Sequence, residues 1–147
     1  MKISNIIGAG LLVGTLDIIA ACLQYFIKTG KGPENVLKFV ASGVFGKEAF
    51  TGGILMSVCG LLFHFLIAFT FTTFFFFIYP KLKFLSYNVI LTAILYGVFT
   101  WAVMNRVVLP LSNTPAIPFT LAGAAIAAGI LCLCIGLPLA IIAKREY

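Results

Sequence analysis

The chain has 147 residues, of which 62% are hydrophobic and 10% are charged, and its mean hydropathy is +1.15. This composition lies outside the range of soluble globular domains and predicts an integral membrane protein. The net charge of +6 would suggest nucleic-acid binding in a soluble protein, but here the basic residues stand between apolar runs and at the chain ends. Anionic lipid headgroups account for such residues, so we expect contacts with membrane lipids and none with nucleic acid.

The first apolar run covers residues 6–27 and predicts a membrane-spanning helix. Small and polar residues recur in it at three- and four-residue steps, and they include Gly10, Gly14 and Asp17. Residues at this spacing share one helix face, which should contact other helices. A second interpretation stays open, because the sequence IAAC ending at Cys22 resembles a lipoprotein cleavage box, after which Cys22 would carry a lipid. The acid within the run and the apolar residues beyond Cys22 are unlike a signal peptide.

The connection after this run is amphiphilic, and residues 33–46 predict a short helix at the membrane interface. A proline and a glutamate at its start suit the first turn of a helix, and three valines with one leucine form an apolar face. The segment is too short and too charged to span a bilayer. It should lie flat as a connector or a lid, with Phe39, Phe45 and Phe50 turned toward the acyl chains.

A second apolar run, residues 53–78, carries no formal charge and contains the one histidine of the chain, His64. At roughly 1.5 Å per residue, a helix of this length crosses a bilayer core of about 30 Å. Ser57 and Gly60 precede His64 by helical spacing, so small and polar residues share one face and phenylalanines occupy the others. We expect the first face to contact protein and the others to contact lipid.

Two further runs, residues 87–109 and 119–143, complete a prediction of four transmembrane helices in one all-α domain that covers residues 1–147. The sequence PLSNTPAIP separates these two runs, and its prolines should end the helix before it. In the fourth run, Gly123 and Ala127 are four residues apart within a stretch rich in alanine and glycine. Such a face allows close helix approach, so we expect the fourth helix at the centre of the bundle.

Four spans place both chain ends on one side of the membrane. Five lysine and arginine residues fall on each side of the predicted bundle, so the plain count does not decide the orientation. The free amino terminus and the dense charge of the short turn with Lys81 and Lys83 favour cytoplasmic ends.

The sequence contains no pattern typical of a hydrolase, a kinase, a nucleotide-binding loop or a zinc site. The four cysteines all lie inside apolar runs, which favours a packing role over disulfides or metal binding. His64 is the only histidine, so a haem held by two histidines would require two subunits. We expect no catalytic residue, no metal and no cofactor.

The two titratable residues in the middle of the first two runs are Asp17 and His64. Consecutive spans are antiparallel and usually pack side by side, so these residues should meet at one depth. An isolated carboxylate in hydrocarbon is costly, and a donor such as imidazole reduces that cost. Tyr96 and Thr100 of the third run, with Cys132 or Cys134 of the fourth, lie at similar depth and could complete a small polar pocket.

Three stretches of the chain resemble small bacterial inner-membrane proteins of the YagU-like family: ASGVFGKEAFTGGILMSVCGLLFHFLIA at 41–68, GTLDIIA in the first run, and LPLSNTPAIPFTLAG at 109–123. The resemblance covers most of the chain. It implies four helices in a bacterial inner membrane, and it implies no reaction, because no activity is established for this family.

The sequence therefore leaves two functions open. In the first, the protein is a small proton-linked transporter, in which Asp17 exchanges a proton for an unidentified small molecule and His64 tunes the proton affinity of Asp17. In the second, it is a structural or accessory scaffold subunit, and the pair only fixes the register of two helices. A membrane enzyme comes third. Four short helices enclose little interior volume, so we expect a homo-oligomer in each case.

Overall fold

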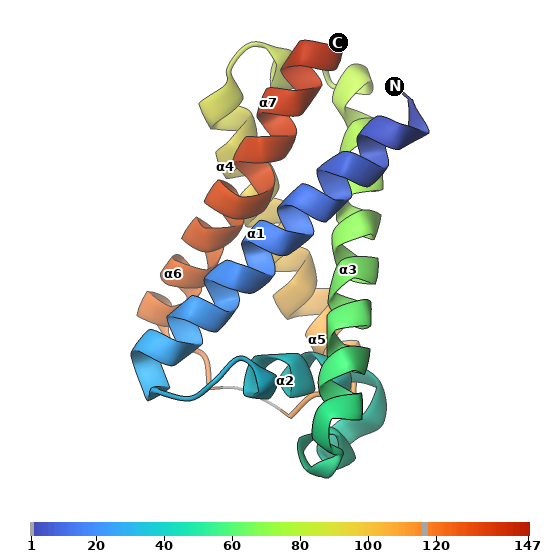
Figure 1. The fold of residues 1–147 in the computed structure, drawn as a ribbon. Coiled ribbons are helices and arrows are strands. Elements are labelled where there is room, and N and C mark those ends of the chain that lie inside the picture. Colours follow the sequence, from blue (N-terminus) through green and yellow to red (C-terminus); the bar gives the residue numbers. More distant parts are fainter. Residues whose placement is uncertain (1, 116–117) are drawn as a thin grey trace.

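The computed structural model describes residues 2–115 and 118–147. Four of its helices are long and apolar enough to cross a membrane, and they span Ile3–Thr29, Gly53–Lys81, Val89–Leu111 and Leu121–Glu146 (Figure 1). No strand occurs in the described part of the chain. The all-α class and the four transmembrane runs are confirmed, and the chain is a multi-pass membrane protein.

Helix α1 (Ile3–Thr29) forms the first span, and α3 (Gly53–Ile78) forms most of the second. The short helix α2 (Glu34–Phe45) lies between these two spans. The third consists of α4 (Val89–Val103), a π-helical turn (Met104–Val108) and α5 (Leu109–Leu111). The fourth consists of α6 (Leu121–Leu131), a second π-helical turn (Cys132–Gly136) and α7 (Leu137–Glu146). Short 3-10 segments occur at Gly46–Thr51, Tyr79–Lys81 and Lys83–Ser86.

Each π-helical turn ends two residues before a proline. Pro110 and Pro138 have no backbone N–H, so the carbonyl groups four residues earlier lose their usual donors. The helix is wider at these turns, because each N–H bonds five residues back: the N–H of Leu109 donates to the carbonyl of Met104, and the N–H of Leu137 donates to that of Cys132. Each helix therefore continues through its proline with one wide turn.

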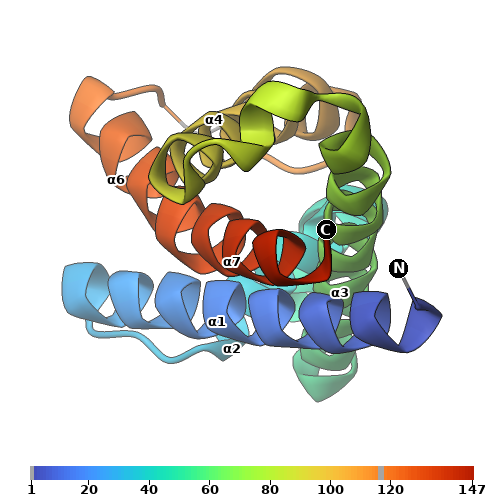
Figure 2. The same ribbon diagram turned by 90° about the horizontal axis from the view of Figure 1, so that it is seen from above.

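Viewed along the bundle, α7 lies between α1 and α4, and α3 lies beside α1 (Figure 2). The buried residues of the fourth span are in its second half, where Leu139, Ala140 and Ala143 are covered on all sides. By contrast, α6 has no buried residue. The expected central position of the fourth helix is thus correct for α7 and wrong for α6, because the inner side of α6 borders a cavity.

Glycines allow the closest helix contacts. A Cβ on Gly97 would overlap the backbone of Cys132, and a Cβ on Gly136 would overlap the carbonyl of Ala93, so α4 and the fourth span touch through their backbones. In the same way, Gly60 of α3 lies against the backbone carbonyl of Leu37 in α2. Gly136 and Cys132, four residues apart, belong to the small-residue spacing of the fourth run, whereas the sequence patterns did not single out Gly97.

The other residues expected to pack helices have different surroundings. Gly10 and Gly14 lie against phenylalanine rings of α3. Ser57 is buried, and its hydroxyl has no hydrogen-bond partner among the described residues. Gly123 contacts only the Thr120 side chain, which caps the start of α6, so the prediction that Gly123 packs against another helix is wrong. Ala127 faces the cavity.

Substitution of Gly97 by alanine should lower the melting temperature in detergent by several degrees. Alanine is better than glycine inside a helix by about 1 kcal/mol, but here its Cβ would push two backbones apart, at a cost of roughly 1–3 kcal/mol. The matched control is Gly129→Ala in α6, where a Cβ meets no atom within 4 Å. Thermal unfolding, monitored by tryptophan fluorescence, should show a lower melting temperature for Gly97→Ala and an unchanged melting temperature for the control. Equal melting temperatures would contradict the backbone contact.

Both chain ends lie at one end of the bundle, together with the turn between α3 and α4 (Figure 1). The side-chain amide of Asn5 donates a hydrogen bond to Glu146 Oε2 at 2.9 Å and so connects the two ends. This placement agrees with an even number of spans.

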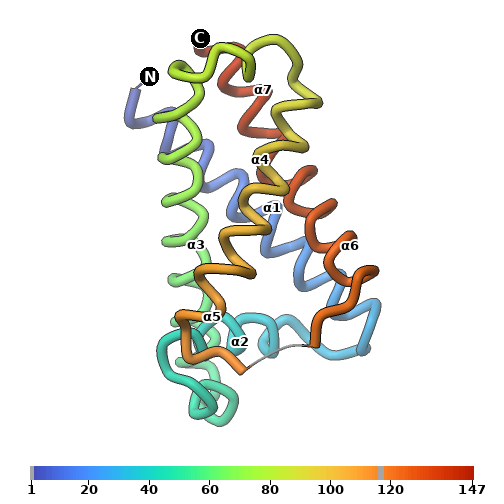
Figure 3. Tube along the Cα trace, turned by 180° about the vertical axis from the view of Figure 1, so that it is seen from behind, coloured from blue at the N-terminus to red at the C-terminus, as the bar shows by residue number. Residues whose placement is uncertain are grey.

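At the other end of the bundle, α2 runs across the bundle axis (Figures 1 and 3). The backbone N–H of Asn113 donates to the Gly43 carbonyl at 3.0 Å, and its side-chain amide donates to the Val44 carbonyl at 3.1 Å. Phe39 faces a cavity inside the protein, so its expected contact with acyl chains is wrong. The reason is that α2 packs on α3, where Gly60 lies against the Leu37 carbonyl. Phe45 and Phe50 remain partly exposed.

Candidate binding cavity at Asp17 and His64

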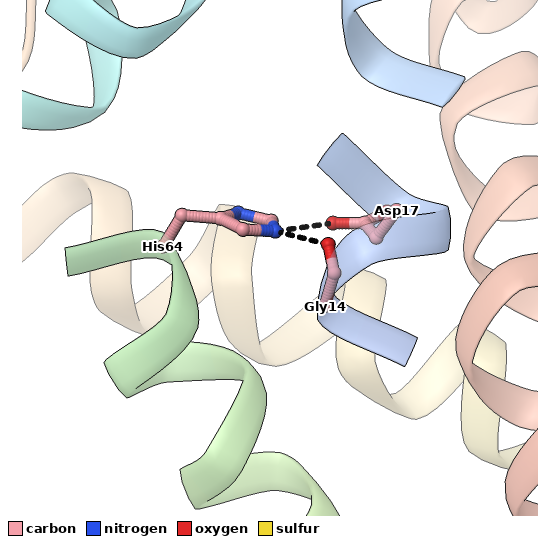
Figure 4. A network of polar contacts seen from close by, with 3 residues as sticks. All are labelled: Gly14, Asp17 and His64. Carbon is pink, nitrogen blue, oxygen red and sulfur yellow. Dashed lines mark hydrogen bonds and ion pairs between the residues drawn. The ribbon is translucent and has the colours of Figure 1, made fainter. Parts of the chain in front are cut away.

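Asp17 of α1 and His64 of α3 point toward each other across the contact between these helices (Figure 4). The distance from His64 Nε2 to Asp17 Oδ2 is 3.8 Å, and the distance from the same nitrogen to the carbonyl oxygen of Gly14 is 2.9 Å. The side chains are largely covered, with 12% of His64 and 18% of Asp17 exposed. The structure therefore brings the two predicted residues together.

The bond to Gly14 determines where His64 carries a proton. A carbonyl oxygen can only accept, so Nε2 must be the protonated nitrogen that donates to it. At 3.8 Å, Asp17 is too far away for a normal hydrogen bond to the same nitrogen, and its contact with His64 is electrostatic. None of the hydrogen bonds between the described residues ends at the Asp17 carboxylate, and its contact with His64 is the 3.8 Å one.

The absence of a side chain at Gly14 makes this geometry accessible. A Cβ there would come within 2.7 Å of the Phe65 ring and 3.2 Å of the Ala68 Cβ, so a larger residue would hold α3 away from α1. With glycine, the imidazole reaches the α1 backbone one turn before Asp17. The stripe of small residues on α1 thus positions the site.

Both side chains border a cavity of about 360 Å³, which lies between α1, α3, α4 and α6 and is covered by α2 at one end. Most of its wall is apolar and includes the aromatic side chains Phe39, Phe71 and Trp101. Its polar lining residues are Asp17, Gln24, His64, Thr100, Asn105, Ser112 and Thr114. No lysine or arginine is among the described residues that line it.

Of the other predicted site residues, Thr100 lines the cavity and Tyr96 does not. The Thr100 hydroxyl donates to the Tyr96 carbonyl at 2.9 Å, which leaves its oxygen free to accept. The Tyr96 ring is 4% exposed, lies 4.7 Å from the Phe75 ring, and donates from its hydroxyl to the Phe71 carbonyl at 2.5 Å. Tyr96 therefore belongs to the aromatic contact between α3 and α4, and its assignment to the site is wrong.

Neither Cys132 nor Cys134 lines the cavity. The Cys132 thiol donates to the Ile94 carbonyl at 3.6 Å, as part of the close contact between α4 and the fourth span. The described residues include no group of three or more histidine, cysteine, aspartate or glutamate side chains that could hold a metal ion.

Several lining residues were not expected at the site. Gln24 follows Asp17 by seven residues on the same face of α1, and this helical spacing was the available signal. Asn105 comes from the π-helical turn of the third span, and Ser112 and Thr114 come from the turn after it. That turn reaches the cavity because it folds back onto α2, which no local pattern indicates.

Comparisons of the chain with models of protein families, with curated proteins and with solved structures found no match.

Proposed function

We propose that this protein is a small proton-linked transporter whose substrate site is the cavity beside Asp17 and His64. The observation that supports it most is a carboxylate in the middle of a span, with no hydrogen bond from the described residues, at the wall of a cavity of about 360 Å³. Cavities that bind small molecules have volumes of roughly 300–1,000 Å³. Ionisable groups inside a membrane are costly, and they usually mark ion or substrate pathways.

In the proposed mechanism, Asp17 binds a proton and the substrate alternately. The ionised carboxylate is stable while the substrate or the nearby imidazole compensates its charge, and a proton neutralises it when the substrate leaves. His64 stays attached to α1 through its bond to Gly14, so it keeps its place beside Asp17 in both states. The two groups would couple movement of the substrate to movement of a proton.

Transport also requires that one end of the cavity opens, and α2 is suited to such a movement. It covers the cavity with Phe39, Val40 and Gly43. The connections on its two sides contain Gly30, Gly46 and Gly53, each with a positive φ. Glycine adopts this conformation without strain, so these positions can serve as hinges. Opening would break the bonds between α2 and the turn at Asn113.

We also propose a location and an orientation. The protein would belong to the YagU-like family, reside in the inner membrane of a bacterium, and form a homo-oligomer. Both ends would face the cytoplasm, since the chain ends lie beside the turn that contains Lys81 and Lys83, and the free amino terminus and the dense charge of this short turn favour that side.

The test is a flux measurement with purified protein in vesicles that contain a pH-sensitive dye. Quaternary ammonium ions, carboxylates, sugars and amino acids are added one class at a time under an imposed pH gradient. We expect at least one class to move protons faster than it does in vesicles without protein. If every class gives the rate of empty vesicles, the proposal is wrong.

A scaffold function is the second candidate, and one contact favours it. The bond from His64 to Gly14 connects α3 directly to the backbone of α1, so the pair can fix the register of these helices without any transport. In that case His64→Ala would lower the stability of the assembled protein in detergent, and no solute would produce proton movement across the vesicle membrane.

A further inference from the structure

The charges around the cavity are unbalanced. Among the described lining residues, Asp17 is the only acidic side chain, and none is a lysine or an arginine. The imidazole of His64 donates its Nε2 proton to the Gly14 carbonyl and remains 3.8 Å from the carboxylate. The wall therefore presents the Asp17 carboxyl group, to which no described residue donates a hydrogen bond, to whatever occupies the cavity.

The aromatic side chains of the wall favour the same kind of ligand. Trp101 of α4, Phe71 of α3 and Phe39 of α2 all border the cavity. The faces of aromatic rings carry partial negative charge and attract cations, by about 0.5–2 kcal/mol each. An anion would be repelled by Asp17, and a neutral ligand would leave the carboxylate without a partner.

The rest of the wall indicates the chemical character of the rest of the ligand. Ile67, Leu131 and Ile135 provide apolar surface around the level of Asp17, whereas Gln24, Asn105 and Ser112 provide hydrogen-bonding groups toward α2. A ligand that fills the space must cover hydrocarbon surface to gain binding energy. A small hydrophilic ion would leave that surface uncovered.

From these observations we infer that the cavity binds an organic monocation with an apolar body, and that its cationic group lies against Asp17. This inference rests on the proposed function, since it names the substrate class of the same cavity. An apolar body suits a binding site inside a membrane, and a single positive charge matches the single carboxylate. Release of the cation on protonation of Asp17 is the exchange that proton-linked transport requires.

The chain contains one tryptophan, Trp101, and it stands in the cavity wall, so its fluorescence reports occupancy directly. The probes are benzyltrimethylammonium and neopentylbenzene, which have the same shape and differ by one positive charge. Each is titrated into the purified full-length protein. We expect a saturable change with the cation, with an affinity at least about tenfold higher than that of the neutral probe.

The Asp17→Asn variant should lower the affinity for the cation by about tenfold or more and leave the response to neopentylbenzene unchanged. The matched control is Glu146→Gln, the same chemical change at the chain end, which should keep the affinity of the native protein. Equal affinities for the two probes, or full affinity for the cation in Asp17→Asn, would overturn the inference.

The inference and the proposed function fail in different ways. Saturable cation binding without any transport would support this inference and contradict proton-linked transport. Proton-coupled movement of carboxylates or sugars, with no fluorescence response to benzyltrimethylammonium, would support the transporter and contradict the cationic substrate.

Discussion

Vesicles that contain the Asp17→Asn variant should show proton-coupled flux reduced by at least about tenfold relative to the native protein. Asparagine has nearly the size of aspartate, but it cannot take up and release a proton. The substitution removes no hydrogen bond between described residues, because the carboxylate accepts none. The variant should therefore fold normally and lose the coupling alone.

Two controls separate this effect from a general loss of structure. The melting temperature of Asp17→Asn should equal or exceed that of the native protein, since a neutral amide is less costly inside a membrane than a carboxylate. Glu146→Gln removes an acid at the end of the bundle, where it bonds to Asn5, and should keep the native flux. If Asp17→Asn transports at the native rate with an intact pH response, Asp17 does not carry the proton.

The second large effect is expected from a covalent link between α2 and the turn after α5. The hydroxyl oxygens of Ser42 and Thr114 are 3.5 Å apart, so cysteines at both positions are close enough to form a disulfide with little movement. In a background in which the four native cysteines are replaced by alanine, oxidation of Ser42→Cys with Thr114→Cys should fix α2 over the cavity. Flux should fall to that of empty vesicles and return after reduction.

Each single cysteine variant is the control for this experiment, because neither can form the link within one chain. Both should transport equally well under oxidising and reducing conditions. Mass spectrometry would establish that the oxidised double variant contains the disulfide. If this variant still transports as fast as it does after reduction of the disulfide, α2 is not the moving cover.

The sequence predicts much of this structure for physical reasons that are local. Each span is a long apolar run, and the bilayer thickness sets its length, so hydropathy locates all four helices. Asp17 and His64 could be paired because neighbouring spans are antiparallel and both residues lie near a midpoint. The glycines of α1 could be recognised from their spacing alone.

The wrong assignments depend on contacts between distant segments. Tyr96 and Thr100 are four residues apart on one face of α4, yet only Thr100 reaches the cavity, because the cavity extends from the membrane centre toward α2 and Tyr96 lies one turn outside it. Phe39 faces inward because α2 packs on Gly60 of α3. A helical repeat shows which residues share a face, and it does not show where a cavity ends.

The central claim is that Asp17 and His64 border a space that water and solutes can enter, and thiol labelling tests it most directly. In the cysteine-free background, a cysteine is placed at Ala127, which lines the cavity, or at Leu133, which is exposed on the outer surface of the fourth span. A small, positively charged, water-soluble thiol reagent should modify Ala127→Cys much faster than Leu133→Cys, and benzyltrimethylammonium should slow the reaction at Ala127→Cys alone. Equally slow modification at both positions would show a dry contact between helices and would contradict the account.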